Sequence, residues 1–439
     1  MLLFNALGCS QSQESNIVRM ARAIDSAQIK IAVESLADFG TRNTMSSSDH
    51  PTRGIGAARR WLVSQLETIN KANGGRLTLE DDRFLHGPDG NRIMRETEIV
   101  NVVATLPGTQ AESRDRIYVV SAHYDSMCND PKDPDCDAPG ADDDASGCAV
   151  VLELARVMSR EPFDATIVFM FVAGEEQGLI GSRHWAKAAR ERGANIAGMI
   201  TNDIVGASRG PSGVDHRGRV RVFSEGVSMT ASGEELKLLQ STGYLSDAPA
   251  RQLARYIDES AARFLGDFDV VCIFRRDRFL RGGDHTAFSE QGYAAVRFTE
   301  FEENYDHQHQ TPRVEEDRAF GDWPKHCDPE YIADVARANL VALAGLAMAP
   351  ASPRDVKIIT TRLTNDTTLK WTRNSEPDLA GYDIVWRTTD APFWQRSLSV
   401  GDVGEFTMPL SKDNVIFGVV AVDREGHRSP ASVPMPATE

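Results

Sequence analysis

The chain has 439 residues, of which 41% are hydrophobic and 26% are charged, a composition typical of globular proteins and long enough for two or three domains. The formal net charge of −16 argues against a nucleic-acid partner, because such a partner requires a basic face. No apolar run reaches the ~18 residues typical of a membrane-spanning helix, so we expect no transmembrane span.

The N-terminal segment, residues 1–27, has features of an export signal. A short apolar stretch, "LLFNAL", precedes "GCSQSQES", and this order is similar to a bacterial lipoprotein processing site with Cys9 as the lipidated residue. The stretch is shorter than the ~7–15 residues of a full signal core, and no Lys or Arg precedes it. We interpret the segment as the remnant of a signal or lipoprotein sequence, with an unstructured start as the alternative. We therefore expect an exported protein that is periplasmic, secreted or anchored by lipid at Cys9.

From residue 28 to residue 348, apolar strands alternate with amphipathic helices. Residues 13–39 and 54–72 have helical periodicity. They are followed by strand patterns such as "EIVNVVATLPG", "RIYVVSAHYDS", "ATIVFMFVAGEE" and "IAGMITNDIVG", with helical patterns between them. This alternation predicts an α/β fold with a mixed, mostly parallel central sheet and helices on both faces. Ligands of such sheets bind at the carboxyl ends of the strands.

After residue 348 the pattern changes. Residues 349–355, "APASPRD", are typical of a linker, and short strands separated by turn residues fill residues 356–439. Their spacing predicts a small all-β sandwich. Trp371, "GYDIVWR" and "FGVVAVDREGHRSPAS" resemble a fibronectin type III module. No catalytic set lies in this region, so we expect it to bind a partner or act as a spacer.

Five of the six cysteines lie beyond the N-terminal segment, and none forms a CxxC pair, so we expect no zinc knuckle. Cys128 and Cys136 flank "NDPKDPD", a loop with little means of packing itself, and we expect a disulfide to stiffen it. Cys148 lies in an apolar helical pattern and is predicted to be a buried thiol. A bridge between Cys272 and Cys327 is compatible with the sequence, which does not determine connectivity.

Histidine and aspartate residues occur at or near the ends of predicted strands. His123 ends one strand, and Asp125 is placed to orient the imidazole ring of His123. In "APGADDDASG" the proline and glycine allow a tight turn that presents Asp143 to two ions, and Asp203 ends another strand. Nitrogen and carboxylate oxygen together suit zinc. A co-catalytic zinc pair requires such ligands, including one carboxylate that bridges the ions.

Two further motifs predict the remaining ligands and a base. "AGEEQG" places Glu175 and Glu176 after an apolar strand, where adjacent carboxylates repel each other unless one binds metal and the other serves as a base for the metal-activated water. "NYDHQHQTP" offers His307 and His309 as the last nitrogen ligand. Each motif alone is typical of a solvated loop. Their combination in a chain with only 10 histidines indicates a metal centre.

Together, "HYDS", "APGADDDASG", "GEEQGLIGS", "TNDIVG" and "GGDHTAF…GYAAVRF…ENYDHQH" resemble the di-zinc exopeptidase family of bacterial secreted leucyl aminopeptidases and glutamate carboxypeptidase-type enzymes. The resemblance covers about residues 28–348 and implies two Zn²⁺ ions per chain. The zinc ligands that it implies are His123, Asp143 (the bridging carboxylate), Glu176, Asp203 and His309. It also implies that Glu175 is the general base. His307 is the alternative to His309 as the last ligand.

The resemblance implies a zinc-dependent exopeptidase, and we expect an aminopeptidase that releases N-terminal residues from peptide substrates. A metal-bridged hydroxide attacks the scissile carbonyl, while Glu175 accepts the proton of the water and returns it to the leaving amine. Asp125 supports this chemistry through the ring of His123. A carboxypeptidase or dipeptidase of the same family is the alternative. The sequence does not determine the oligomeric state.

One departure from the family concerns the group that stabilises the oxyanion. Secreted leucyl aminopeptidases place a tyrosine shortly before the "DH" motif, whereas this chain reads "RRDRFLRGGDH". Arg281, Tyr305 and Tyr293 are the candidates to replace that tyrosine. We expect the arginines of this stretch to form salt bridges with Asp277, Asp284 and nearby acids. Their alternative role is to bind a substrate carboxylate, which would favour carboxypeptidase or dipeptidase specificity.

Two other classes of protein are compatible with the same fold. A glutaminyl cyclase-like acyltransferase uses a single zinc and lacks the first histidine ligand, and the intact "HYDS" motif with His123 argues against this class. A non-catalytic, receptor-like relative would have lost the glutamate pair or the bridging aspartate. Both features are present in this chain.

Overall fold

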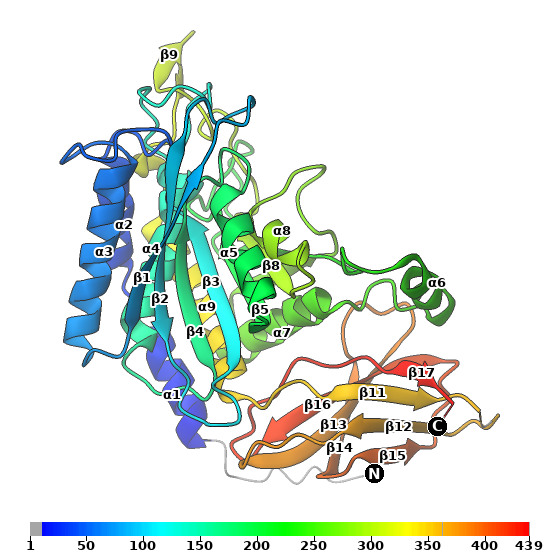
Figure 1. Cartoon of the computed structure of the whole chain (residues 1–439). Coiled ribbons are helices and arrows are strands. Elements are labelled where there is room, and N and C mark those ends of the chain that lie inside the picture. Colours follow the sequence, from blue (N-terminus) through cyan, green and yellow to red (C-terminus); the bar gives the residue numbers. More distant parts are fainter. Residues whose placement is uncertain (1–10, 362, 439) are drawn as a thin grey trace.

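The computed structural model describes residues 11–361 and 363–438. Its larger part is a layered α/β body, and a smaller all-β part lies below it in Figure 1. The central sheet has the strand order β1-β2-β4-β3-β5-β8-β6-β7 and contains both parallel and antiparallel pairs, as predicted. Its strands are β1 (Thr78–His86), β2 (Thr97–Leu106), β3 (Arg116–His123), β4 (Thr166–Val172), β5 (Asn195–Asn202), β6 (Arg219–Ser224), β7 (Asp269–Ile273) and β8 (Ala295–Thr299).

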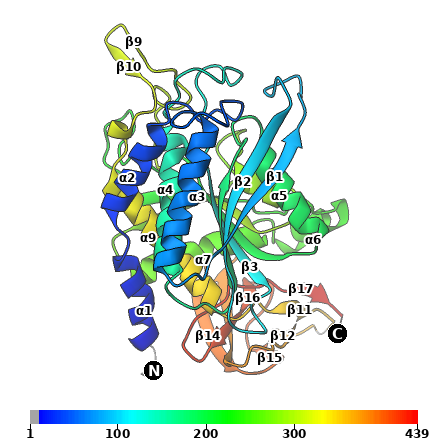
Figure 2. The ribbon, with the colours of Figure 1, turned by 60° about the vertical axis from the view of Figure 1, so that its left-hand side comes forward.

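Helices cover both faces of this sheet, and Figure 2 shows α2, α3, α4 and α9 together on one face. The helices that pack in the larger core are α1 (Gln11–Arg22), α2 (Ser26–Ala37), α3 (Ile55–Ala72), α4 (Gly147–Met158), α7 (Pro249–Phe264) and α9 (Pro329–Met348). The opposite face carries α5 (Ile180–Glu191) and α8 (Asp284–Ser289). A further helix, α6 (Gly233–Thr242), has no buried residue.

The uninterrupted apolar sequence of β4 follows from its burial on both faces of the sheet. Because successive side chains of a strand point to opposite faces, Phe169 and Phe171 enter the larger core, whereas Val168 and Met170 enter the core under α5. All residues of β4 are buried. The sheet is thereby fixed between two apolar layers, and its carboxyl edge provides a rigid base for polar side chains.

Three local features differ from the sequence prediction or extend it. The helical pattern of residues 13–39 is interrupted, because the Asp25 side chain accepts a hydrogen bond from the amide of Ala27 and caps a new helix, α2. Strand β1 has no buried residue, so its sequence lacks the apolar alternation that reveals a strand. The short hairpin of β9 (Arg313–Glu315) and β10 (Arg318–Phe320) lacks that signal for the same reason.

The core also includes part of the N-terminal segment. Ile17 and Met20 are 1% and 2% exposed and pack in the larger core. Near the C-terminal end of the α/β sequence, α9 is the one helix among the described residues that is long and apolar enough to cross a membrane, but 83% of its apolar window is buried inside the protein. Such burial is typical of a helix in a protein core, so α9 is a core helix of the α/β body.

The all-β part consists of two sheets with strand orders β15-β12-β11-β17 and β14-β13-β16. Leu369, Trp371, Tyr382 and Phe417 fill the space between them. This part is called the β-sandwich below. Its strands are β11 (Arg354–Ile359), β12 (Thr367–Thr372), β13 (Leu379–Thr388), β14 (Arg396–Gly401), β15 (Glu405–Met408), β16 (Val415–Asp423) and β17 (Met435–Ala437).

Buried ion pairs join the β-sandwich to the α/β body, and we call this contact the seam. The carboxylate of Asp247, before α7, receives Arg255 from α7 and Arg387 from β13, each at 2.8 Å. Arg116, at the start of β3, donates to Glu376 of the β-sandwich at 3.3 Å. All five side chains are almost fully buried. The seam is therefore a fixed contact in which each buried carboxylate has an arginine partner.

Candidate metal centre

The first group of predicted ligands meets at the carboxyl edge of the sheet. His123 ends β3, Asp203 follows β5, and Asp143 lies in the turn of residues Ala141–Ser146. Nε2 of His123 is 3.0 Å from Oδ1 of Asp143 and 3.9 Å from Oδ1 of Asp203. All three side chains are buried. One nitrogen and two carboxylates thus converge at a distance that a metal ion can span.

A second group shares Asp143 with the first. Nε2 of His309 is 2.9 Å from Oδ2 of Asp143 and 3.1 Å from Oε2 of Glu176. The two oxygens of Asp143 therefore face different histidines, Oδ1 facing His123 and Oδ2 facing His309. The result is two three-residue groups that share one carboxylate. We call them the His123 group and the His309 group.

The donors of both groups fit zinc, which binds imidazole nitrogen and carboxylate oxygen. Oε1 of Glu176 is buried and has no hydrogen-bond partner, which is costly for a carboxylate unless a cation contacts it. Burial opposes the charged form of His123 and His309, yet the carboxylates around them raise the pKa of both rings well above the usual value. Positive charge therefore stabilises these buried carboxylates, and a bound cation would supply it.

The turn that carries Asp143 is held from both sides. The carboxylate of Asp322 accepts hydrogen bonds from the backbone amides of Asp142 and Asp143, at 2.9 and 2.8 Å. From the other side, the fully buried guanidinium of Arg42 donates to the two carbonyls that precede the turn. These bonds fix the backbone of the turn, so Asp143 has little freedom to leave its place between the two groups.

Asp125 connects the ring of His123 to the glutamate pair. Its carboxylate accepts hydrogen bonds from the amide of Glu175 at 3.3 Å and from the amide of Glu176 at 3.1 Å. Nδ1 of His123 lies closer to the Asp125 carbonyl, at 3.2 Å, than to its carboxylate, at 3.5 Å. Asp125 therefore holds the ring mainly through its backbone and uses its carboxylate to position the glutamate loop.

Glu175 stands apart from the two ligand groups. It is half-buried. Burial raises the pKa of its carboxyl group well above the usual value, and the negative charges of Asp203 and Glu176 add to this effect, while His123 opposes it. Unlike its neighbour Glu176, Glu175 does not lie in either three-residue group. A carboxyl group of raised proton affinity beside the cluster is suited to accept and return a proton.

The two candidate histidines of the last motif occupy different environments. The ring of His307 stacks on His326 at a centroid distance of 3.7 Å, and its Nε2 lies 3.3 Å from the amide of Asn304. His309 reaches Asp143 and Glu176 and has a φ of 56°. A positive φ is uncommon for a residue other than glycine and often marks a functional position. The structure thus brings His309, and not His307, into the cluster.

Two of the four arginines before the "DH" motif pair with acids. Arg278 pairs with Asp277 at 3.0 Å and with Glu303 at 2.8 Å, and Arg281 lies 3.3 Å from the same Glu303. Among the ion pairs of the described residues, those of this stretch go to Asp277 and Glu303, and the expected pairing with Asp284 is wrong. The Asp284 side chain is fully buried in α8, and the loop directs Arg278 and Arg281 toward Asp277 and Glu303 instead.

The two tyrosines proposed for oxyanion stabilisation lie in contrasting places. The hydroxyl of Tyr293 donates to the carbonyl of Ala194, and its ring packs in the core under α5, so it is not available to a substrate. Tyr305 is 62% exposed. The Arg281 side chain is one-third exposed and keeps its contact with Glu303. Tyr305 and Arg281 therefore remain the candidates for contact with a substrate.

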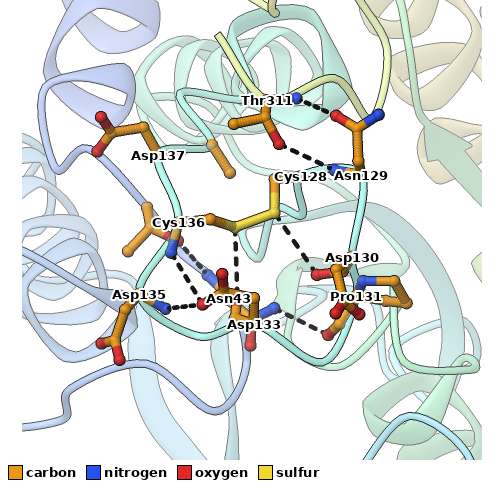
Figure 3. Close-up of a disulfide and its surroundings, with 12 residues drawn as sticks. Asn43, Cys128, Asn129, Asp130, Pro131, Asp133, Asp135, Cys136, Asp137 and Thr311 are labelled. Carbon is orange, nitrogen blue, oxygen red and sulfur yellow. Dashed lines mark hydrogen bonds between the residues drawn. A yellow bond between two sulfur atoms is a disulfide. The ribbon is translucent and has the colours of Figure 1, made fainter.

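A disulfide joins Cys128 to Cys136 and closes the acidic loop between His123 and Asp143 (Figure 3). The figure shows the carboxylates of Asp135 and Asp137 pointing away from each other, which suits a solvated rim and not a cation site. Among the described residues Cys148, Cys272 and Cys327 are free, so the bridge considered between the last two is wrong. Cys148 is buried, as expected.

The disulfide loop also contacts the segment that carries His309. The amide of Asn129 in the loop donates to Oγ1 of Thr311 at 3.5 Å, and the amide of Thr311 donates back to Oδ1 of Asn129 at 2.5 Å. Nδ2 of Asn129 reaches the Gln310 side chain at 3.3 Å. The loop therefore braces the chain just beyond His309 and forms one wall beside the cluster.

Sequence reasoning missed three buried residues that organise the cluster. Asp322 and Arg42 hold the turn of Asp143, and they lie in irregular segments whose sequence gives no sign of this role. Arg297 lies in β8, and its Nη2 donates to Oδ1 of Asp203 at 2.8 Å. A signal for Arg297 exists in the sequence, because it is the one charged residue within the apolar stretch "YAAVRF".

Comparisons with known proteins show which family and which fold the chain resembles. The model of peptidase family M28 matches residues 101–324. A protein of Pyricularia oryzae described as a probable zinc metalloprotease is 43% identical over 433 residues, which cover 97% of this chain and 86% of that protein. The LapA aminopeptidase of Legionella pneumophila has a TM-score of 0.54 at 18% identity, with 79% of this chain and 78% of LapA covered. A glutaminyl cyclase of Macrostomum lignano has a TM-score of 0.53 at 15% identity, covering 78% of this chain and 95% of that one. The two structures share the fold alone.

Proposed function

The chain belongs to peptidase family M28 and is a zinc metalloprotease of that family, and on this premise we propose that it is a di-zinc aminopeptidase that releases N-terminal residues from peptides. The shared fold does not choose between a peptidase and a glutaminyl cyclase, because both kinds of structure resemble the chain equally well. The proposal is supported by the ligand groups themselves.

The observation that carries the proposal is the position of Asp143. Its two oxygens lie 3.0 Å from His123 and 2.9 Å from His309, so a single carboxylate serves two ligand groups. A lone metal site needs no such shared carboxylate, whereas a co-catalytic pair requires one. In this arrangement His123 and Asp203 would hold one zinc ion, Glu176 and His309 would hold the other, and Asp143 would be a ligand of both.

The chemistry assigned to the chain's own residues is proton transfer and orientation. Zinc, when bound, supplies a Lewis acid that activates water and polarises the scissile carbonyl. Glu175 takes a proton from the attacking water and delivers it to the nitrogen of the leaving amine. The Asp125 carboxylate accepts a hydrogen bond from the backbone amide of Glu175 and so holds that residue in place. The backbone carbonyl of Asp125 contacts Nδ1 of His123 and fixes the ring. Proton transfer and orientation both need fixed geometry, which the surrounding hydrogen bonds provide.

The preference for an N-terminal amine rests on what the chain offers to the two ends of a peptide. We expect the free α-amine of the substrate to bind at the metal centre. The contrary role, in which Arg281 binds a substrate carboxylate, is weakened by the contact of Arg281 with Glu303. An aminopeptidase is therefore favoured over a carboxypeptidase or dipeptidase.

A set of three peptides of one sequence tests this function. The first peptide has free ends, the second is acetylated at its N-terminus, and the third is amidated at its C-terminus. We expect mass spectrometry to show stepwise N-terminal trimming of the first and third peptides, while the acetylated peptide stays intact. C-terminal trimming of the acetylated peptide would indicate a carboxypeptidase. Cyclisation of an N-terminal glutamine without hydrolysis would indicate an acyltransferase.

We also propose that the protein is exported and that the β-sandwich is a fibronectin type III-like module for binding or spacing. The disulfide supports export, because such bonds persist in oxidising compartments. Cys9, the proposed lipid-bearing residue, lies outside the described residues. Mass mapping of protein isolated from cells checks both points. A reduced Cys128 and Cys136 would contradict export, and an unmodified Cys9 would contradict the anchor.

A further inference from the structure

The two ligand groups differ in the positive charge that the protein places beside them. Arg297 lies in β8, its side chain is fully buried, and its Nη2 is 2.8 Å from Oδ1 of Asp203. This oxygen is also the one that approaches Nε2 of His123, at 3.9 Å. A guanidinium group and a metal ion in the His123 group would therefore share a single carboxylate.

The His309 group contains no comparable arginine contact among the described residues. The ion partner of Glu176 is His309, at 3.1 Å from Oε2, and Oε1 of Glu176 is buried without any hydrogen-bond partner. Asp143 contacts the two histidines and receives a hydrogen bond from the neutral amide of Gln308 at 3.1 Å. No arginine therefore neutralises Glu176, whereas the negative charge of Asp203 is partly neutralised by Arg297.

Arg297 is held firmly in this position. Its Nη1 donates to the carbonyl of Gly282 at 3.1 Å and lies 3.6 Å from Oδ2 of Asp277. At Gly283, an added Cβ atom would lie 2.6 Å from Nη1, so the backbone packs directly against the guanidinium group. An arginine stays charged at any pH at which proteins fold. The positive charge beside Asp203 is therefore permanent and cannot swing away when a metal binds.

We propose that Arg297 is an internal counter-ion of Asp203, so that the His123 group binds zinc more weakly than the His309 group does. The inference rests on the proposed di-zinc function. A fixed positive charge opposes a divalent cation at the same carboxylate, and it stabilises the buried Asp203 when that cation is absent. Arg297 is thus a positioning residue that acts through a ligand and keeps the metal-free site folded.

Single-site variants compare the two groups without changing Arg297. Glu176→Gln leaves the His123 group intact, and Asp203→Asn leaves the His309 group intact. We expect competition with a chromophoric zinc chelator to show weaker binding in the Glu176→Gln protein than in the Asp203→Asn protein. Equal binding, or tighter binding in the Glu176→Gln protein, would overturn the proposal even if no Arg297 variant folds.

Replacement of the arginine tests its role directly. In Arg297→Met the loss of the competing charge should tighten the weaker zinc site by at least about 10-fold, because like charges repel strongly at this distance in a buried site. The metal-free variant should melt well below the metal-free wild type, and saturating zinc should remove most of this difference. Arg297→Lys retains the charge and should retain the weak site.

Arg255→Met is the matched control, because Arg255 is also buried and paired with an aspartate, Asp247, but contacts no ligand. Its loss of stability should be the same with and without zinc. Unchanged zinc affinities in Arg297→Met would overturn the role of Arg297 while leaving the di-zinc proposal intact. A wild-type chain that holds only one zinc ion would instead contradict the di-zinc proposal itself.

Discussion

Strand β3 begins at Arg116 of the seam and ends at His123 of the cluster. Buried charge is accommodated in different ways at these two ends. At the amino end, Arg116 pairs with Glu376, and nearby Asp247 receives two arginines. At the carboxyl end, His123 faces carboxylates whose partners are mainly histidines, and one oxygen of Glu176 has no partner at all. The seam gives each of its buried carboxylates an arginine partner from the chain, whereas Glu176 in the cluster has none.

This difference separates a structural ion pair from a metal site. A buried carboxylate is costly unless a positive group contacts it. Where arginines fill that role, as at Asp247, the group stabilises the contact between two parts of the molecule. Where they do not, as at Glu176, the chain depends on a cation from solution. Arg297 beside Asp203 combines the two situations, because an arginine of the chain and a proposed metal ligand meet there.

The largest expected effect concerns the glutamate pair within the cluster. Glu175→Gln should lower kcat by ~10²–10⁴, the usual contribution of a general base, while zinc content stays at the wild-type value. Glu176→Gln should instead lose zinc, because Glu176 is the proposed ligand whose buried oxygen has no partner in the chain. Steady-state kinetics and metal analysis of the two variants measure both effects. Loss of zinc in Glu175→Gln with retention in Glu176→Gln would reverse the two roles.

Substitutions in the seam should lower the free energy of unfolding and leave zinc binding unchanged. Asp247→Asn leaves Arg255 and Arg387 buried without a carboxylate partner, and we expect the free energy of unfolding to fall by about 3–5 kcal/mol. Chemical denaturation measures this change. Asp402→Asn, which removes an exposed partner of Arg373, serves as the control and should cost less than about 1 kcal/mol. A change in zinc content in Asp247→Asn would show that the two ends are coupled.

The smallest expected effect concerns the disulfide loop, which contains none of the proposed ligands and contacts the chain just beyond His309. Cys128→Ser should lower the free energy of unfolding by up to about 2–3 kcal/mol, because the unfolded chain gains the freedom of an open loop. KM should rise, since Asn129 in the loop braces Thr311 beside His309. Zinc content should not change. Cys272→Ser, which removes a free thiol, is the control, and an equal loss of stability there would contradict the assigned role of the bridge.

The sequence predicts the fold and the convergence of the ligands for a physical reason. Apolar strands such as β4 are buried on both faces and leave a continuous apolar pattern. His123 ends its strand and Asp203 directly follows one, and the carboxyl ends of parallel strands meet at one edge of a sheet. The choice between His307 and His309 required the resemblance to a known family, because both histidines lie in the same loop and only the backbone conformation decides which one turns inward.

The parts that the sequence did not predict depend on distant contacts. Arg42 and Asp322 hold the turn of Asp143 from segments that lie far from it in the chain, and neither segment carries a recognisable motif. The pairing of Asp247 with Arg387 spans 140 positions, so no local pattern encodes it. Such contacts become visible only when the elements are placed in space.

The central claim is that the cluster around Asp143 holds two zinc ions, and zinc content tests it most directly. Native mass spectrometry of the purified wild-type protein, in buffer with a small excess of zinc, should find two zinc ions per chain. The same measurement on Asp143→Ala should find little or no zinc, because both groups lose the carboxylate that they share. A wild-type chain with a single zinc ion, or an Asp143→Ala protein that retains two, would contradict the account.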